Sequence, residues 1–222
     1  MKEASPGLDI SFGLSCPLFA QHFTQSFSDV NALTANESAL VNGFSKKRIG
    51  DFSTGRSCAR QALTRLGVAE AEILTGPRKE PLWPAGIVGS ISHSKKLAGA
   101  VVARSTSLRA IGLDIEETGR VKPEMWNAVF SASEQGFLNS LPAVEQVFHT
   151  TLFFSMKESF YKLQYPLTNQ FLWFNDVEIG QEDGKFRMQV KKEFDNKTLL
   201  PEFTNMHFTR FQDLVMTLCF LE

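Results

Sequence analysis

Cysteine is scarce in this 222-residue sequence, which contains only Cys16, Cys58 and Cys219. The three are far apart, odd in number and form no CxxC pair. A disulfide framework or a structural zinc site needs paired or closely spaced cysteines, so neither is expected. We instead expect reduced, buried thiols, which are typical of a cytoplasmic protein.

An excess of charge of either sign is also absent. The 23 basic and 24 acidic residues give a net charge of −1, so no global basic field favours nucleic acid or an anionic membrane. No run of about 18 apolar residues occurs, which argues against a membrane span. The start, MKEASPGLDISFG, lacks the apolar core of a signal peptide, so a cytoplasmic location is expected. Any anionic ligand must be held by local charges.

Two common catalytic motifs are missing. There is no GxSxG, so a serine-hydrolase interpretation fails on pattern. There is no Walker A loop either, which removes the usual phosphate cradle of P-loop enzymes.

The residues that are present predict a globular α+β protein. Hydrophobic residues make up 43% and charged residues 21%, and 20 phenylalanines supply an aromatic core. Periodicity and turn residues predict strands, then a helix, strands, helices and strands. The expected helices are 45–66, 123–138 and 142–164. Short strands are expected within 1–30, where Leu8, Ile10, Phe12 and Leu14 alternate with other residues, and longer ones at 97–105 and 109–117. Two hairpins are expected in 177–190 and 206–221, and the turn of the first is expected at Glu182, Asp183 and Gly184. Residues 76–87 are expected to form a structured loop that leads into GSISHS, and a boundary between two halves is expected near residue 110.

The segment RAIGLDIEE carries the first chemical signal. In a strand, alternate side chains face opposite ways, so the apolar set enters the core. Asp114 and Glu116 then share the other face, roughly 7 Å apart at Cα. Such a pair fits a hard, oxygen-seeking ion such as Mg²⁺. A solvent-exposed face that ends in an acidic turn explains the short pattern equally well.

The segment FSMKESFYKL carries the second signal. Phe153, Met156, Phe160 and Leu163 form one apolar helical stripe, with Glu158 and Lys162 on the opposite side. Glu four residues before Lys is the preferred order of a surface pair. From this segment alone, a solvated helix face and half of a catalytic site both remain open.

The segment GSISHS carries the third signal. Its hydroxyls and His93 can donate hydrogen bonds to an oxyanion. Arg78 and Lys79 lie in the proline-stiffened loop upstream, and the preceding helix adds Arg48, Arg56 and Arg60. Together these residues suit phosphate groups. A turn with a partly buried, hydrogen-bonded histidine is the alternative.

Taken in order, the three segments resemble the 4′-phosphopantetheinyl transferase superfamily. Its pattern is G-S-[IL]-[ST]-H, then G-[IL]-D-[IV]-E, then [WF]-[ST]-x-K-E-[SA]-x-x-K, which here read GSISHS, GLDIE and FSMKESFYK. The finer resemblance is to the enterobactin synthetase component D branch. It rests on FSTGRSCARQALTRLG, EPLWPAGIVGSISHS, Phe154 in place of Trp, and YPLTNQFLWFNDVEI. The resemblance covers about residues 45 to 180.

The resemblance implies an α+β fold of two similar halves, related by a pseudo-twofold with the active site between them. The expected halves are 1–110, with the elements that bind the phosphates of coenzyme A, and 111–222, with the metal-binding and catalytic helix. One compact pseudo-dimeric unit is expected, as a monomer.

The resemblance also implies an activity. The protein is expected to move the 4′-phosphopantetheine arm of coenzyme A to a serine of an apo acyl, aryl or peptidyl carrier protein, releasing 3′,5′-ADP. The branch suggests the carriers of a nonribosomal, enterobactin-like siderophore synthetase. The alternatives are a Mg²⁺-dependent phosphohydrolase and a non-catalytic coenzyme A-binding module.

Site roles follow from the resemblance, residue by residue. Asp114, Glu116 and Glu158 would hold Mg²⁺, with Mn²⁺ as the alternative. Asp114, Glu158 and Lys162 would be catalytic, with Glu158 the expected base although the choice among the carboxylates is open. The expected contacts to coenzyme A are Arg48, Arg56, Arg78, Lys79, Ser92, His93, Asp114, Lys157 and Lys162. His93 is assigned to the 3′-phosphate, whereas RKEP departs from many members and leaves open which of Arg78 and Lys79 meets the cofactor. The carrier is expected to dock near residues 123–140, where Met125, Trp126 and Phe130 offer apolar side chains, at least two of which are expected to belong to the core.

Overall fold

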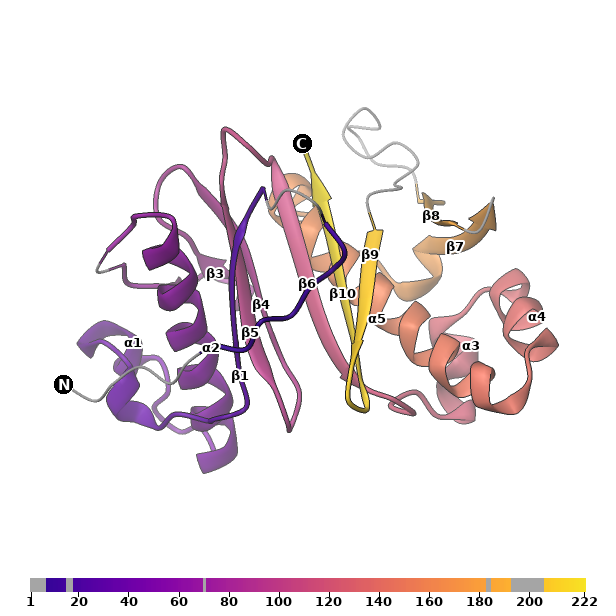
Figure 1. Cartoon of the computed structure of the whole chain (residues 1–222), viewed down its shortest axis with the longest axis horizontal. Coiled ribbons are helices and arrows are strands. Elements are labelled where there is room, and N and C mark those ends of the chain that lie inside the picture. The colour runs from indigo at the N-terminus through magenta and orange to yellow at the C-terminus, as the bar shows by residue number, and fades with distance from the viewer. Residues whose placement is uncertain (1–6, 15–17, 70, 183–184, 193–205) are drawn as a thin grey trace.

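Two three-stranded antiparallel sheets lie side by side between two long helices in the computed structural model of the chain (Figure 1). The structure describes residues 7–14, 18–69, 71–182, 185–192 and 206–222. The long helix α2 covers the first sheet and the long helix α5 covers the second. The order of layers is therefore helix, sheet, sheet, helix.

The first half is built on α2. Its sheet has the order β1–β5–β4, and a small β2–β3 hairpin stands beside it. The Ser45 side chain accepts a hydrogen bond from the Arg48 amide and caps the start of α2, while Gly67, with φ of +76°, follows its end. The elements are β1 (Ala20–Thr24), η1 (Val30–Ala32), α1 (Ala35–Ala39), α2 (Lys46–Arg65), β2 (Leu74–Thr75), β3 (Pro81–Leu82), β4 (Ile87–His93) and β5 (Ala98–Arg104).

The second half is built on α5. Its sheet has the order β6–β10–β9, and the β7–β8 hairpin lies beyond α5. Asn169, with φ of +53°, ends α5 in the left-handed conformation that Asn tolerates. The elements are β6 (Ala110–Glu117), η2 (Pro123–Met125), α3 (Trp126–Val129), α4 (Ala132–Ser140), α5 (Ala143–Thr168), η3 (Phe174–Asp176), β7 (Val177–Glu182), β8 (Lys185–Val190), β9 (Met206–Phe211) and β10 (Leu214–Leu221).

The two halves repeat one topology. Each begins with a strand, continues through a long helix and returns with two antiparallel strands, and in each sheet the last strand lies between the first and the penultimate one. The predicted α+β fold of two similar halves is thereby confirmed. The division between 110 and 111 stays a prediction; β6 begins at Ala110.

Three apolar clusters make the core. One lies beneath α2 around Leu63 and Ile73, and one beneath α5 around Phe153 and Phe160. The third joins the two sheets, because it combines Phe23 and Val101 with Leu113, Ile115 and Met216. This shared cluster holds β4 and β6 at a fixed distance, which is what positions the candidate site.

Buried serines tie β4 to β6. Ser90 Oγ accepts a hydrogen bond from the Leu113 amide at 3.0 Å, and Ser92 Oγ accepts one from the Ile115 amide at 3.2 Å. Side chains of one strand thus satisfy backbone donors of the other, where an ordinary ladder would use carbonyl groups. The segment GSISH is consequently part of strand β4, not a loop. The alternation of side chains along β4 puts Ser90 and Ser92 toward β6. The interpretation of GSISHS as a loop was wrong because serine and glycine usually mark turns.

Several other predicted elements are confirmed and some are wrong. The helices beginning near 45 and 142, the strands at 97–105 and 109–117, and both C-terminal hairpins are present. Residues 8–14 form no strand, although Ile10 and Phe12 are buried. The expected helix 123–138 is divided at Phe130, because Ser131 caps a new helix with Glu134. The expected loop 76–87 contains the β2–β3 hairpin, and of the predicted turn after β7, Asp183 and Gly184 lie outside the described residues.

Two further expectations can be compared with the described residues. No helix among them is long and apolar enough to cross a membrane. Cys58 and Cys219 are buried free thiols, and burial raises the pKa of each to about 12, as expected for inert cysteines. Cys16 lies outside the described residues.

Candidate active site

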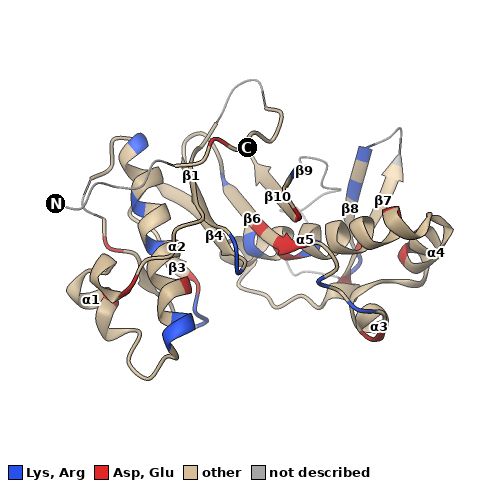
Figure 2. Ribbon diagram, turned by 60° about the horizontal axis from the view of Figure 1, so that its bottom comes forward, with Lys and Arg blue, Asp and Glu red and all other residues tan. Residues whose placement is uncertain are grey.

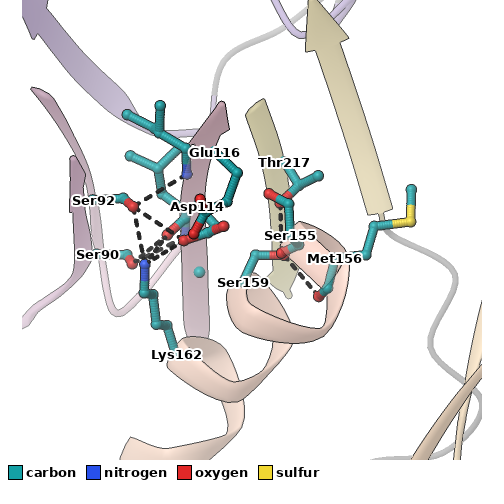
Figure 3. Close-up of polar contacts among 12 residues, drawn as sticks. Ser90, Ser92, Asp114, Glu116, Ser155, Met156, Ser159, Lys162 and Thr217 are labelled. Carbon is teal, nitrogen blue, oxygen red and sulfur yellow. Dashed lines mark hydrogen bonds and ion pairs between the residues drawn. The ribbon is translucent and has the colours of Figure 1, made fainter. Parts of the chain in front are cut away.

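The centre of the candidate site is a contact between the two signature segments of the second half. Lys162 on α5 places its ammonium 2.8 Å from Asp114 Oδ1 on β6 (Figure 3). The ammonium also donates to Ser92 Oγ at 3.0 Å and to the Leu113 carbonyl at 3.1 Å. Ser92, from the first half, donates to the same Asp114 oxygen at 3.1 Å. All three predicted residues therefore meet at the junction of the two halves.

Close packing of α5 on β6 makes this contact geometrically possible. A Cβ atom at Gly112 would lie 1.9 Å from the carbonyl oxygen of Ser159, so only glycine permits the observed approach. Asp114 follows two residues later on the same face of β6, and it is 3% exposed. The polar face of β6 thus lies beneath a helix, so the alternative of a solvent-exposed acidic face is wrong for Asp114.

The three acidic side chains act on one another. The pKa of Glu116 is raised to about 7, chiefly by burial and also by the charges of Asp114 and Glu158, against the lowering effect of Arg120 and Lys162. Burial is also the main cause of the raised pKa of Glu158, with Asp114 adding to it and Lys162 opposing it. Burial of these carboxylates therefore outweighs the attraction of the neighbouring cations.

The residues fit a hard divalent ion, although they do not form a ready-made ligand set. Asp114 Oδ2 is buried without a hydrogen-bond partner, which is costly for a carboxylate oxygen unless a cation approaches it. All the donors are carboxylate oxygens, the type that Mg²⁺ and Mn²⁺ prefer. Within the described part of the chain, no three His, Cys, Asp or Glu side chains lie close enough to hold one ion as they stand. The predicted triad of Asp114, Glu116 and Glu158 stays a prediction.

Two adjoining cavities flank the basic β2–β3 turn. The first, of 310 Å³, is bordered by Arg78, Lys79, Glu158 and Lys162. The second, of 460 Å³, is bordered by Arg48, Lys79 and His93. Lys79 borders both, with φ of +71° in the turn. Figure 2 shows basic residues along α2 and acidic residues on β6 and α5 in the middle of the molecule, so cations and carboxylates meet across this region.

His93 ends strand β4 at the mouth of the second cavity, and its side chain is exposed. The pKa of His93 is nevertheless lowered, chiefly because the imidazole is partly shielded from water. Lys162 and Lys47 lower it further, and Asp51 opposes them. A neutral imidazole at the end of β4 can donate one hydrogen bond into the cavity.

Arg56 does not face either cavity. Its guanidinium is 6% exposed and donates to the Ile73 carbonyl at 2.7 Å and to Thr75 Oγ1 at 3.1 Å. Burial lowers its pKa to about 10. In the structure this side chain supports the backbone at β2 and so the base of the turn that carries Arg78 and Lys79, and the predicted contact of Arg56 with coenzyme A stays a prediction.

Lys157 is hydrogen-bonded inside the protein, and its predicted contact with coenzyme A stays a prediction. Its side chain is 1% exposed, and its ammonium donates to Glu134 Oε2 at 2.7 Å, the Val129 carbonyl at 2.9 Å and the Phe174 carbonyl at 3.0 Å. An ammonium has three protons, so every donor is used. Glu134 additionally accepts from the Ile179 amide. Lys157 therefore fixes α3, α4 and η3 to α5, and the sequence pattern gave no sign of this because Glu134 is 23 residues away.

A third, apolar cavity was not predicted. It measures 380 Å³ and adjoins Glu158 on the side away from Lys79, bordered by Ala128, Tyr161, Phe171, Leu172 and Trp173 among others. Trp173 is 67% exposed and packs edge-on against Phe171, with ring centres 4.8 Å apart. The run FLWF after the helix was a signal for an exposed aromatic surface. Of the predicted docking residues, Phe130 is buried, whereas Met125 and Trp126 are partly buried.

The arrangement can hold a diphosphate beside a base. Lys162, Arg78 and Lys79 offer cationic donors around one cavity, and Glu158, with its raised pKa, borders the same cavity. A carboxylate whose pKa is moved toward neutrality is suited to accept a proton. The cavity therefore combines cations that suit phosphate groups with a carboxylate that can accept a proton.

Comparisons with known proteins point the same way. Residues 36–103 match a family model described as the 4′-phosphopantetheinyl transferase N-terminal domain, and residues 110–219 match the 4′-phosphopantetheinyl transferase superfamily. The chain is 39% identical to 4′-phosphopantetheinyl transferase Svp of Streptomyces mobaraensis over 71% of this chain and 65% of that protein. It is 36% identical to PptT of Mycobacterium tuberculosis, a 4′-phosphopantetheinyl transferase, over 72% of this chain and 71% of that protein.

More distant likenesses were also found. Enterobactin synthase component D of Salmonella typhi is 33% identical over 62% of this chain and 57% of its own length. The chain thus spans less than two thirds of this relative and of the Streptomyces protein. Holo-[acyl-carrier-protein] synthase of Thermotoga maritima superposes on 52% of this chain and 64% of its own at 24% identity, with a TM-score of 0.41.

Proposed function

We propose that this chain, which belongs to the 4′-phosphopantetheinyl transferase superfamily, transfers the 4′-phosphopantetheine arm of coenzyme A to a serine of an apo carrier protein. The observation that carries the proposal is the meeting of Ser92, Asp114 and Lys162, each from a different signature segment, beside a cavity bordered by Glu158 and two basic residues.

In the proposed reaction, the serine hydroxyl oxygen forms a bond to the β-phosphorus of the coenzyme A pyrophosphate. The bond from that phosphorus to the bridging oxygen breaks, and 3′,5′-ADP leaves with the electron pair. Glu158 takes the hydroxyl proton, because it borders the cavity and its raised pKa suits a base near neutral pH.

Lys162 and the basic turn orient the diphosphate and balance the charge that grows on it. Lys162 is 28% exposed at its side chain, so its ammonium can turn from Asp114 toward a phosphate oxygen. An interaction that strengthens as the leaving group gains charge lowers the barrier. Arg78 and Lys79 add charge on the far wall of the cavity. His93, with Arg48 and Lys79 beside it, is the proposed contact to the 3′-phosphate.

Asp114, Glu116 and Glu158 are the proposed holders of Mg²⁺, with Mn²⁺ as the alternative. When bound, such an ion offsets negative charge on the diphosphate. The unpartnered Oδ2 of Asp114 supports this assignment, as does the effect of the Asp114 and Glu158 charges in raising the pKa of Glu116.

The partner is proposed at a finer level as well. The likeness to enterobactin synthase component D supports aryl or peptidyl carrier domains of a nonribosomal siderophore synthetase. The exposed Phe171 and Trp173 beside Glu158 supply apolar surface where the carrier's serine must arrive.

A direct test is to incubate the protein with coenzyme A, Mg²⁺ and a panel of apo acyl, aryl and peptidyl carrier proteins, and to weigh the products. We expect the mass of the phosphopantetheine arm on at least one carrier, and none on a carrier whose acceptor serine is replaced by alanine. Release of 3′,5′-ADP without any carrier would instead indicate a phosphohydrolase. Binding of coenzyme A without either product would indicate a non-catalytic module.

A further inference from the structure

We infer that Lys162 competes with the divalent ion for Asp114, and that coenzyme A ends this competition by drawing the lysine away. The inference rests on the proposed function and deepens it. It makes Lys162 the link through which the diphosphate and the metal affect each other's binding.

One carboxylate oxygen of Asp114 is already occupied in the structure. Asp114 Oδ1 receives both the Lys162 ammonium, at 2.8 Å, and the Ser92 hydroxyl, at 3.1 Å. A divalent cation on the same carboxylate would lie against the ammonium, and like charges repel strongly where water is scarce. Asp114 is 3% exposed, so solvent screens this repulsion poorly.

Lys162 is held by more than charge. It also donates to Ser92 Oγ and to the Leu113 carbonyl, so all three ammonium protons are used at β4 and β6. A metal on Oδ1 must displace these hydrogen bonds, and a metal on the unpartnered Oδ2 must tolerate the ammonium on the other oxygen of the same carboxylate. Either outcome weakens metal binding in the absence of coenzyme A.

Lys162 has an alternative position. Its side chain borders the same cavity as Arg78 and Lys79, and it keeps partial exposure there. A diphosphate in this cavity offers the ammonium several charged acceptors, whereas it now has one carboxylate oxygen and two neutral oxygens. Coenzyme A and the ion should consequently bind with positive coupling, and each should raise the other's affinity by the same factor.

The experiment uses Mn²⁺ as the probe, titrated into the full-length protein and followed by the paramagnetic resonance signal of the free ion. Without coenzyme A, Lys162→Met should bind Mn²⁺ about tenfold or more tightly than the wild type, which corresponds to the loss of one charge-assisted contact at the carboxylate. Lys162→Gln, which keeps hydrogen-bond donors, should shift the affinity in the same direction and covers the case in which the methionine variant does not fold.

A matched control distinguishes the direct contact of Lys162 with Asp114 from the general effect of removing a positive charge near the site. Arg120→Met removes a cation that lies 3.8 Å from Glu116 but does not touch Asp114, and it should change Mn²⁺ affinity less than Lys162→Met. In a second series, coenzyme A should raise Mn²⁺ affinity more in the wild type than in Lys162→Met. Free coenzyme A without protein corrects for chelation in solution.

The outcomes are distinguishable. Equal or weaker Mn²⁺ binding by both Lys162 variants overturns the inference while leaving the proposed transfer reaction intact. Equal gains in the Arg120 and Lys162 variants also overturn it, since the effect is then one of charge alone. Coupling to coenzyme A that is unchanged by Lys162→Met overturns the link to the diphosphate. Failure of the wild type to bind Mn²⁺ even with coenzyme A overturns the proposed metal site itself, and the inference with it.

Discussion

Lys162 and Asp114, 48 positions apart in the sequence, form an ion pair of 2.8 Å that joins the long helix of the second half to its first strand. Ser92 from the first half donates to the same carboxylate oxygen. A contact that draws on three separate segments responds to any change in how the two halves pack.

Replacing the carboxylate tests the central assignment. We expect Asp114→Asn and Glu158→Gln each to lower the turnover of carrier modification by about 100-fold or more, because each removes charge from groups that act in the transition state. Turnover is measured by the mass gained by the carrier under saturating coenzyme A and Mg²⁺.

Glu117→Gln is the control for these variants, since Glu117 is the next acidic residue of β6 and points away from Asp114 by strand alternation. Its turnover should stay near that of the wild type. Near-normal transfer by Asp114→Asn or Glu158→Gln would remove that residue from the site.

Removing the imidazole of His93 tests the assignment to the 3′-phosphate. We expect His93→Ala to raise the KM for coenzyme A about tenfold, the effect of losing one hydrogen bond to a charged group. Dephospho-coenzyme A lacks that phosphate, so its KM should change little. Steady-state kinetics with both cofactors give the comparison, and Lys95→Ala, which removes an exposed charge two residues away, controls for long-range attraction. An equal rise for both cofactors would contradict the assignment.

The buried pair of Lys157 and Glu134 should matter for stability. With side-chain exposures of 1% and 0%, removing one partner leaves a buried charge, so Lys157→Met should lower the free energy of unfolding by about 3–5 kcal/mol. The double variant Lys157→Met with Glu134→Gln should lose less than the sum of the single changes. Urea denaturation measures both.

An exposed pair supplies the comparison for this prediction. Lys47→Met breaks the i,i+4 pair with Asp51, in which Lys47 is 69% exposed, and should cost no more than about 0.5 kcal/mol. If Lys157→Met instead left stability unchanged and raised the KM for coenzyme A, Lys157 would be a cofactor contact after all.

Glu116 should make stability depend on pH. Its pKa is raised from 4.5 to about 7, so between these values the folded protein binds more protons than the unfolded chain. The free energy of unfolding therefore falls as pH rises through this window. In the presence of a metal chelator, Glu116→Gln should match the wild type near pH 4 and exceed it in stability near pH 8. Denaturation at several pH values tests this, and a constant difference across the range would refute it.

The sequence predicted those elements whose signals are local. Alternation placed Asp114 and Glu116 on one face of β6, and helical periodicity followed by a glycine predicted α2. The outcome for Lys157 and Arg56 could not be predicted in the same way. Each lies in a segment that resembles a binding motif, yet each is bound by backbone carbonyls of elements that are distant in the sequence, and only the tertiary fold brings those together.

Strand β4 shows a different limit. Gly89, Ser90 and Ser92 have turn-like propensities, which predicted a loop. Pairing with β5 and the demand of β6 for acceptors overrode that preference, because Ser90 and Ser92 satisfy amides that would otherwise be buried without partners. The apolar cavity at Phe171 and Trp173 was missed because its walls come from three separate segments.

The absence of a side chain at Gly112 limits the substitutions that this protein can accept during evolution. The main chains of α5 and β6 touch there, and a Cβ atom at position 112 would lie 1.9 Å from the Ser159 carbonyl oxygen, far inside van der Waals contact. A single added carbon at position 112 would therefore lift the helix from the strand and part Lys162 from Asp114.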